Sequence, residues 1–165
     1  MTTRDGLIRE LTHEARTTRR HLERLPESRL GWRPHDKSFT AGALACHIVD
    51  CLDWTAPIFT KDEHDMDPAS YRPYQAVSLG ELLAAFDERV ARGTQAMAGA
   101  VEDGLQQPWR LKIRGRLRFE RPRADVFRDM TLSHLIHHRG QLSVYLRLLD
   151  VAVPGSYGPS ADEGA

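Results

Sequence analysis

Two histidines one helical turn apart are the residues of this chain best suited to chemistry. His134 and His138 lie four positions apart in the stretch SHLIHHRGQL, residues 133–142. In a helix this spacing places both imidazoles on one face, where they can share a metal ion. The stretch therefore predicts a pair of metal ligands.

A third histidine, His47, lies far earlier in the chain, in an apolar run with helical periodicity. An imidazole buried there without a hydrogen-bond partner would cost on the order of 1–3 kcal/mol. One such histidine is often an ordinary core residue bonded to a carbonyl, and paired histidines also arise by chance. Taken together, three inward-facing rings on two helices predict one metal centre with His47, His134 and His138 as its ligands.

Three neutral imidazoles would leave at least one coordination position for water or substrate, which is typical of a catalytic site. A set of histidines without a cysteine suits a divalent metal, namely zinc, nickel or iron(II). The pattern does not choose among these metals, and the sequence assigns no catalytic residue.

Three neighbouring residues are further candidates for the site. Asp50, three positions after His47, could orient an imidazole as an outer carboxylate. His137 lies about 100 degrees around the helix from His138, so we place it on the flank of the site or on the surface. Arg139 could face an anionic group of a substrate or simply solvent, and the solvent interpretation is favoured.

The two cysteines are expected to be reduced. Cys46 and Cys51 lie five positions apart in one expected helix and point in different directions, which argues against a mutual disulfide. Only Cys51 lies one turn from His47, where a thiolate could act as a ligand. Packing in the core is the favoured interpretation for both cysteines.

Four amphipathic helices are expected to position these residues. Apolar periodicity marks each helix, Pro26 closes the first, and Ser78 with Glu81 forms a capping box before the third. A long irregular crossover, residues 60–77, joins the second helix to the third. The expected helices span about 4–25, 41–59, 79–102 and 124–149. This order predicts an all-α fold, a four-helix bundle whose sites lie between facing helices.

The segment from Gln107 to Arg123 breaks the helical pattern. Its apolar residues alternate with basic ones around Gly115, which predicts a small two-stranded hairpin or an extended loop. The basic residues resemble a nucleic-acid-binding stripe, but such alternation in a strand pair usually marks a solvated face. We therefore expect no nucleic-acid partner.

Size and charge bound the remaining classes of protein. At 165 residues, the chain suits one domain spanning residues 1–165. Lysine plus arginine equals aspartate plus glutamate at 23 each, so no net field attracts nucleic acid or an anionic membrane. Neither a signal-peptide pattern nor an apolar run of about 18 residues is present. We expect a soluble, cytoplasmic protein that acts on a small molecule.

Several motifs resemble the DinB/YfiT-like superfamily of proposed bacterial metalloenzymes. They are LP followed by GWRP within residues 25–34, ACHIVD around His47, HLIHHRGQL in the last helix, and the closing VPGSYGPS. These motifs occur in the family's order and cover nearly the whole chain. The resemblance is specific to the superfamily and much less specific to any one activity.

This resemblance implies a four-helix bundle with a long crossover, a homodimer, and a divalent metal held by His47, His134 and His138. Characterised relatives include transferases and isomerases that use bacillithiol or mycothiol. The implied function is therefore a transferase that activates a low-molecular-weight thiol at the metal. Two alternatives remain, which are a metal-dependent hydrolase and a metal-binding stress-response module without chemistry.

Overall fold

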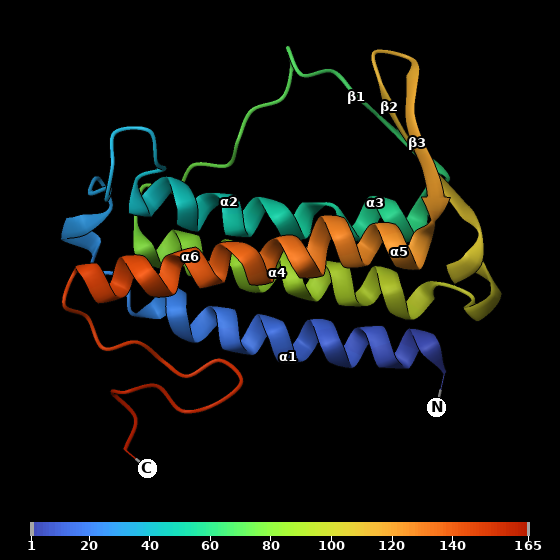
Figure 1. Cartoon of the computed structure of the whole chain (residues 1–165). Helices are drawn as coiled ribbons and strands as arrows, with labels where there is room; N and C mark the ends of the chain where they lie inside the picture. Colours follow the sequence, from blue (N-terminus) through green and yellow to red (C-terminus); the bar gives the residue numbers. More distant parts are fainter. Residues whose placement is uncertain (1, 165) are drawn as a thin grey trace.

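The computed structural model describes residues 2–164 and shows long helices packed side by side (Figure 1). The first and third expected helices are α1, Thr3–Glu23, and α4, Leu79–Gly99. The second is α2, Ala41–Asp53, continued by the short α3, Thr55–Thr60. The fourth combines α5, Arg123–Phe127, the turn η3, Arg128–Ser133, and α6, His134–Leu148. Two 3-10 turns, η1 (Glu27–Arg29) and η2 (Glu102–Gln106), lie in the connections.

Local capping explains where the central helices begin. The hydroxyl of Thr40 accepts a hydrogen bond from the amide of Ala43, and the hydroxyl of Ser78 accepts one from the amide of Glu81. Each bond satisfies an amide that has no partner within its own helix. The helix start predicted from Ser78 is confirmed.

The apolar faces of the four helical segments meet in one core. Leu11 of α1, Ile48 of α2 and Phe86 of α4 are each at most 1% exposed, as is Leu142 of α6. Among residues 2–164, no helix has the length and hydropathy needed to cross a membrane.

The all-α fold class is wrong, because the structure contains a three-stranded mixed sheet in the order β1-β2-β3. Strands β2, Pro108–Ile113, and β3, Arg116–Pro122, form the expected hairpin, with positive φ at Arg114 and Gly115 in its turn. Strand β1, Glu63–Met66, lies inside the crossover and pairs parallel to β2. The sheet rises from one side of the bundle, above α3 and α5, and the rest of the crossover passes over α2 (Figure 1).

A π-helical turn, η3, precedes the histidine motif directly and links α5 to α6. In a π turn the backbone bonds span one more residue than in an α-helix, so the carbonyls shift relative to the following side chains. His134 is the first residue of α6 after this turn. Such turns are frequent at functional sites.

Candidate metal centre

Three histidines and one cysteine converge between α2 and α6. The ligand atoms of His47, Cys51, His134 and His138 all lie within 4.8 Å of one another. The His47 ring centroid is 5.1 Å from that of His134 and 4.5 Å from that of His138. The three histidines predicted from the sequence are therefore brought together, and the cluster could hold a metal ion.

The spacing of two ring nitrogens fits a divalent cation. Nε2 of His47 lies 3.3 Å from Nε2 of His134. Two nitrogens bound to one tetrahedral metal at 2.0–2.1 Å would lie about 3.3–3.4 Å apart. Two imidazole lone pairs at this distance repel each other unless a proton or a cation lies between them.

The outer sides of two of these rings are held by hydrogen bonds. Nδ1 of His138 donates to Oε1 of Gln141 at 2.7 Å. The ring of His134 donates to the backbone carbonyl of Met130, which lies in η3. A donor bond on one ring nitrogen fixes the tautomer and leaves the other nitrogen with a free lone pair. Our sequence analysis missed Gln141, although its position one turn from His138 was a usable signal.

Burial keeps the three rings in the neutral form that binds metal. It is the main cause that lowers the pKa of His47, His134 and His138 below the ordinary histidine value. The neighbouring rings lower each pKa further, while the Gln141 bond partly opposes this for His138. At neutral pH each ring therefore keeps one nitrogen without a proton, and this nitrogen can bind a cation.

Cys51 is a fourth potential donor in the same cluster. Its side chain is 1% exposed, and burial raises the pKa of its thiol to about 12. The sequence favoured packing alone for this residue, but the sulfur lies among the ring nitrogens. Cys46 lies outside the cluster, where its sulfur accepts a hydrogen bond from the amide of Ala76 at 3.4 Å.

Asp50 faces the crossover loop. Its carboxylate accepts hydrogen bonds from the amide of Tyr74, at 3.1 and 3.2 Å, and from the hydroxyl of Tyr71, at 3.3 Å. These bonds fasten the loop to α2. The sequence suggested that the Asp50 carboxylate bonds to an imidazole. In the structure it bonds to the crossover loop instead.

His137 and Arg139 lie outside the cluster on different sides. His137 is exposed, and its Nε2 accepts a hydrogen bond from Nε2 of Gln141. Arg139 is only 2% exposed, so the favoured solvent interpretation is wrong. Its guanidinium forms an ion pair with Glu14 of α1 at 2.5 Å. Because the guanidinium is already paired, it is not free to bind the anionic group of a substrate.

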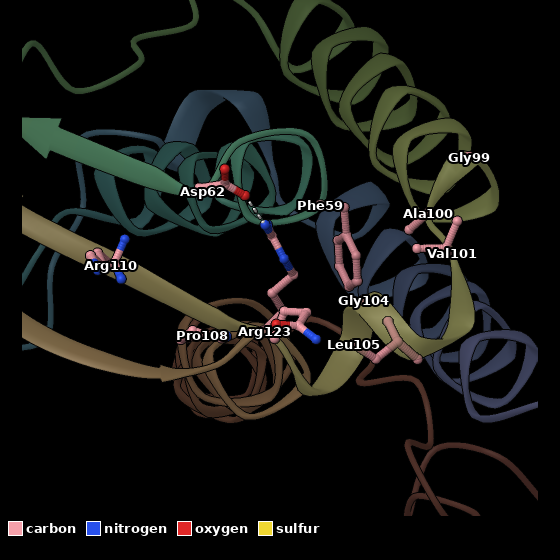
Figure 2. A pocket seen from close by; sticks show the side chains of 11 residues that line it. Phe59, Asp62, Gly99, Ala100, Val101, Gly104, Leu105, Pro108, Arg110 and Arg123 are labelled. Carbon is pink, nitrogen blue, oxygen red and sulfur yellow. Dashed lines mark hydrogen bonds and ion pairs between the residues drawn. The ribbon is translucent and has the colours of Figure 1, made fainter.

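Two cavities of similar size lie in different parts of the molecule. One, of about 550 Å³, adjoins His47 and is bounded by α2 and the crossover loop. The other, of about 540 Å³, lies near the sheet, and Arg123 crosses it to pair with Asp62 (Figure 2). Its lining contains no histidine or cysteine. The cavity beside His47 is therefore the one placed to serve the metal cluster.

Comparisons with known proteins agree with this architecture. A sequence model of the DinB superfamily matches residues 10–142. The uncharacterized protein YrdA of Bacillus subtilis (strain 168) is 25% identical over 164 residues, which cover 99% of this chain and 93% of YrdA. A crystal structure of a DinB-like protein from Bacillus cereus ATCC 10987 has a TM-score of 0.69 and 22% identity, covering 93% of this chain and 97% of its own. The DinB-like protein YjoA from Bacillus subtilis has a TM-score of 0.71 and 15% identity, covering 92% of this chain and 96% of its own. On the strength of the family match over most of its length, the chain belongs to the DinB superfamily.

Proposed function

We propose that this protein is a divalent-metal-dependent transferase that uses a low-molecular-weight thiol. In this proposal His47, His134 and His138 hold zinc, nickel or iron(II). The observation that carries it is the 3.3 Å approach of two partly buried ring nitrogens, from His47 and His134, in a cluster that also holds the ring of His138. When bound, a divalent cation lowers the pKa of a thiol or a water, so that a nucleophile forms at neutral pH.

The chain itself supplies position and environment. Helices α2 and α6 hold the three rings close together, and Gln141 and the Met130 carbonyl fix the orientation of two of them. The cavity beside His47 shares that side chain with the cluster, and in this proposal a small substrate binds there. Because most of that cavity is lined by apolar and aromatic side chains, it shields the reacting groups from bulk water.

A closed metal centre without chemistry is the second candidate, and Cys51 is the observation that favours it. If its sulfur joins three imidazoles, four protein donors complete a tetrahedral set and leave no position for a thiol or a water. The protein would then be a metal-stabilised binding module. A hydrolase would share the open site of the first proposal and differ in using water as the nucleophile.

Turnover of an electrophilic dye separates these functions. Untagged, zinc-loaded protein is incubated with monochlorobimane and, in turn, mycothiol, bacillithiol and cysteine. The transferase proposal predicts turnover that depends on a thiol, stops with a chelator, and is lost in His138→Ala. If no thiol supports turnover while zinc stays bound, the transferase proposal is contradicted.

The cobalt(II) form tests the closed centre directly. With no thiol added, a ligated Cys51 would give a cobalt–thiolate charge-transfer band in the near ultraviolet that disappears in Cys51→Ala. The open site predicts that this band is absent from the protein alone and emerges when a thiol is added.

A further inference from the structure

The cavity beside His47 has two walls of different origin. One wall comes from the end of the first connection and from α2, with Phe39, Ala43, His47 and Asp50. The other comes from the crossover loop, namely Tyr71 and residues 73–76. Because the ring of His47 belongs to both the cavity and the histidine cluster, a molecule in the cavity would lie beside any metal held there.

Aromatic side chains dominate the rim of this cavity. Phe39 is 50% exposed and Tyr71 is 48% exposed, which places both among the large apolar side chains that folding leaves open to solvent. Both line this cavity, together with Tyr74 and Pro73. Apolar side chains gathered at a concave surface are typical of a ligand site, and here they suit an apolar or aromatic body.

The only charged side chain among the residues that line the cavity is acidic. Asp50 is the acidic residue of the lining, which contains no lysine or arginine. Arg89 lies over the ring of Tyr74, but its guanidinium is bound to both carboxylate oxygens of Asp53. A ligand carboxylate would therefore meet a like charge and no basic partner.

Asp50 also keeps room for a ligand. It accepts hydrogen bonds from the Tyr74 amide and the Tyr71 hydroxyl, whereas a carboxylate offers about four acceptor positions. An ammonium or hydroxyl group of a ligand could occupy a remaining position. An ammonium would in addition be attracted by the faces of the neighbouring aromatic rings.

We propose that this cavity selects a substrate with an apolar or aromatic body and an amino or hydroxyl group, and that it rejects one with a carboxylate at the same place. Asp50 is the specificity-determining residue. The inference rests on the proposed function, because it takes the cavity beside His47 to be the place where the substrate binds. It goes beyond that function by naming the class of substrate.

Three probes that share a phenyl ring and differ in the end group test this inference. They are phenethylamine, 2-phenylethanol and 3-phenylpropionate, titrated into the protein by calorimetry. We expect phenethylamine to bind at least about tenfold more tightly than 3-phenylpropionate, with the alcohol between them. In Asp50→Asn the ratio of the two dissociation constants should fall to within about twofold.

Tyr71→Phe is the matched control, because it removes one hydrogen bond to Asp50 and leaves the charge in place. It should keep the preference for the amine. Since amines and carboxylates can also bind a metal directly, each titration is repeated on zinc-loaded and on chelator-treated protein. The same order of affinities is expected in both.

The inference is overturned if none of the probes binds, if the carboxylate binds as tightly as the amine, or if Asp50→Asn keeps the full preference. The inference is also contradicted if the expected order of the three affinities is found only in the zinc-loaded protein. These results are distinguishable from failure of the proposed function, in which the charge preference would be present but no thiol would support dye turnover.

Discussion

Two polar clusters, one buried and one partly buried, lie on different faces of α6 and differ in how their members are paired. On the face toward α1, the Arg139 guanidinium pairs with the Glu14 carboxylate, and the hydroxyl of Tyr157 bridges the two. On the face toward α2, the rings of His134 and His138 meet that of His47. The first cluster balances its charges within the chain. The second gathers neutral donors that could together hold a cation.

A further buried histidine shows that burial alone does not make a site. His21 of α1 is 0% exposed, and its Nδ1 bonds to the carbonyl of Thr17 one turn earlier. Burial lowers its pKa, as it does for the three clustered histidines. What distinguishes the cluster is the approach of ring nitrogens from two helices.

Breaking the ion pair of α6 should have the largest effect on stability. In Arg139→Met the Glu14 carboxylate stays buried without its partner, which costs about 3–5 kcal/mol of unfolding free energy. Urea denaturation measures this loss. The double variant Glu14→Leu with Arg139→Met should recover much of it, because no lone charge remains. A single-variant loss below about 1 kcal/mol would contradict the view that this pair is a completed buried cluster.

Zinc should stabilise the protein through the other cluster. Binding to the folded state alone adds about 2.7 kcal/mol when free zinc is 100 times the dissociation constant. For a chain of this length the midpoint of thermal unfolding would rise by about 5–10 °C. Thermal scans with zinc and with a chelator measure the difference. Identical midpoints under the two conditions would argue against a metal in the folded protein.

Removing the outer hydrogen bond of one ligand should weaken the metal without removing it. Gln141→Leu leaves Nδ1 of His138 without its acceptor, so we expect zinc affinity to fall about 10–100-fold. Competition with a chelating dye gives the affinity. The control is His137→Ala, because His137 bonds to the amide nitrogen of Gln141 and packs edge-on against the ring of His138 without a hydrogen bond to it. Equal losses in both variants would show that Gln141 does not position His138.

Acid should destabilise the metal-free protein through the same histidines. Their pKa values lie below the ordinary value of 6.5 in the folded state. As pH falls below about 6.5, the unfolded chain takes up protons that the folded chain does not, so stability decreases. Urea denaturation of chelated protein at several pH values measures this slope. In His47→Gln the unfolding free energy should depend less steeply on pH. An unchanged dependence would show that His47 does not contribute to the acid destabilisation.

Most of the helical fold was predictable because its signals are local. Apolar spacing and the caps at Thr40 and Ser78 depend on residues a few positions apart. Strand β1 was not predictable, because its sequence EHDM lacks an apolar alternation and its partner residues lie far along the chain. Its side chains bond there as well, with Glu63 accepting from Lys112 at 2.7 Å.

The site was predictable to the extent that spacing along one helix determined it. The separation of His134 and His138 was sufficient to group them, and the apolar run around His47 suggested that it faced inward. Arg139 was misinterpreted because its environment depends on Glu14 of α1, which sequence spacing cannot bring near it. Cys51 lay at the right spacing from His47, but only the packing of α2 against α6 shows which way its sulfur points.

The metal content of untagged protein tests the central claim most directly. Elemental analysis of purified, zinc-equilibrated wild type and His137→Ala should find about one zinc per chain. Under the same conditions His47→Ala and His138→Ala should lose most of it, with circular dichroism showing that the helices are retained. Full occupancy in both of these variants would contradict a metal held by imidazoles from α2 and α6.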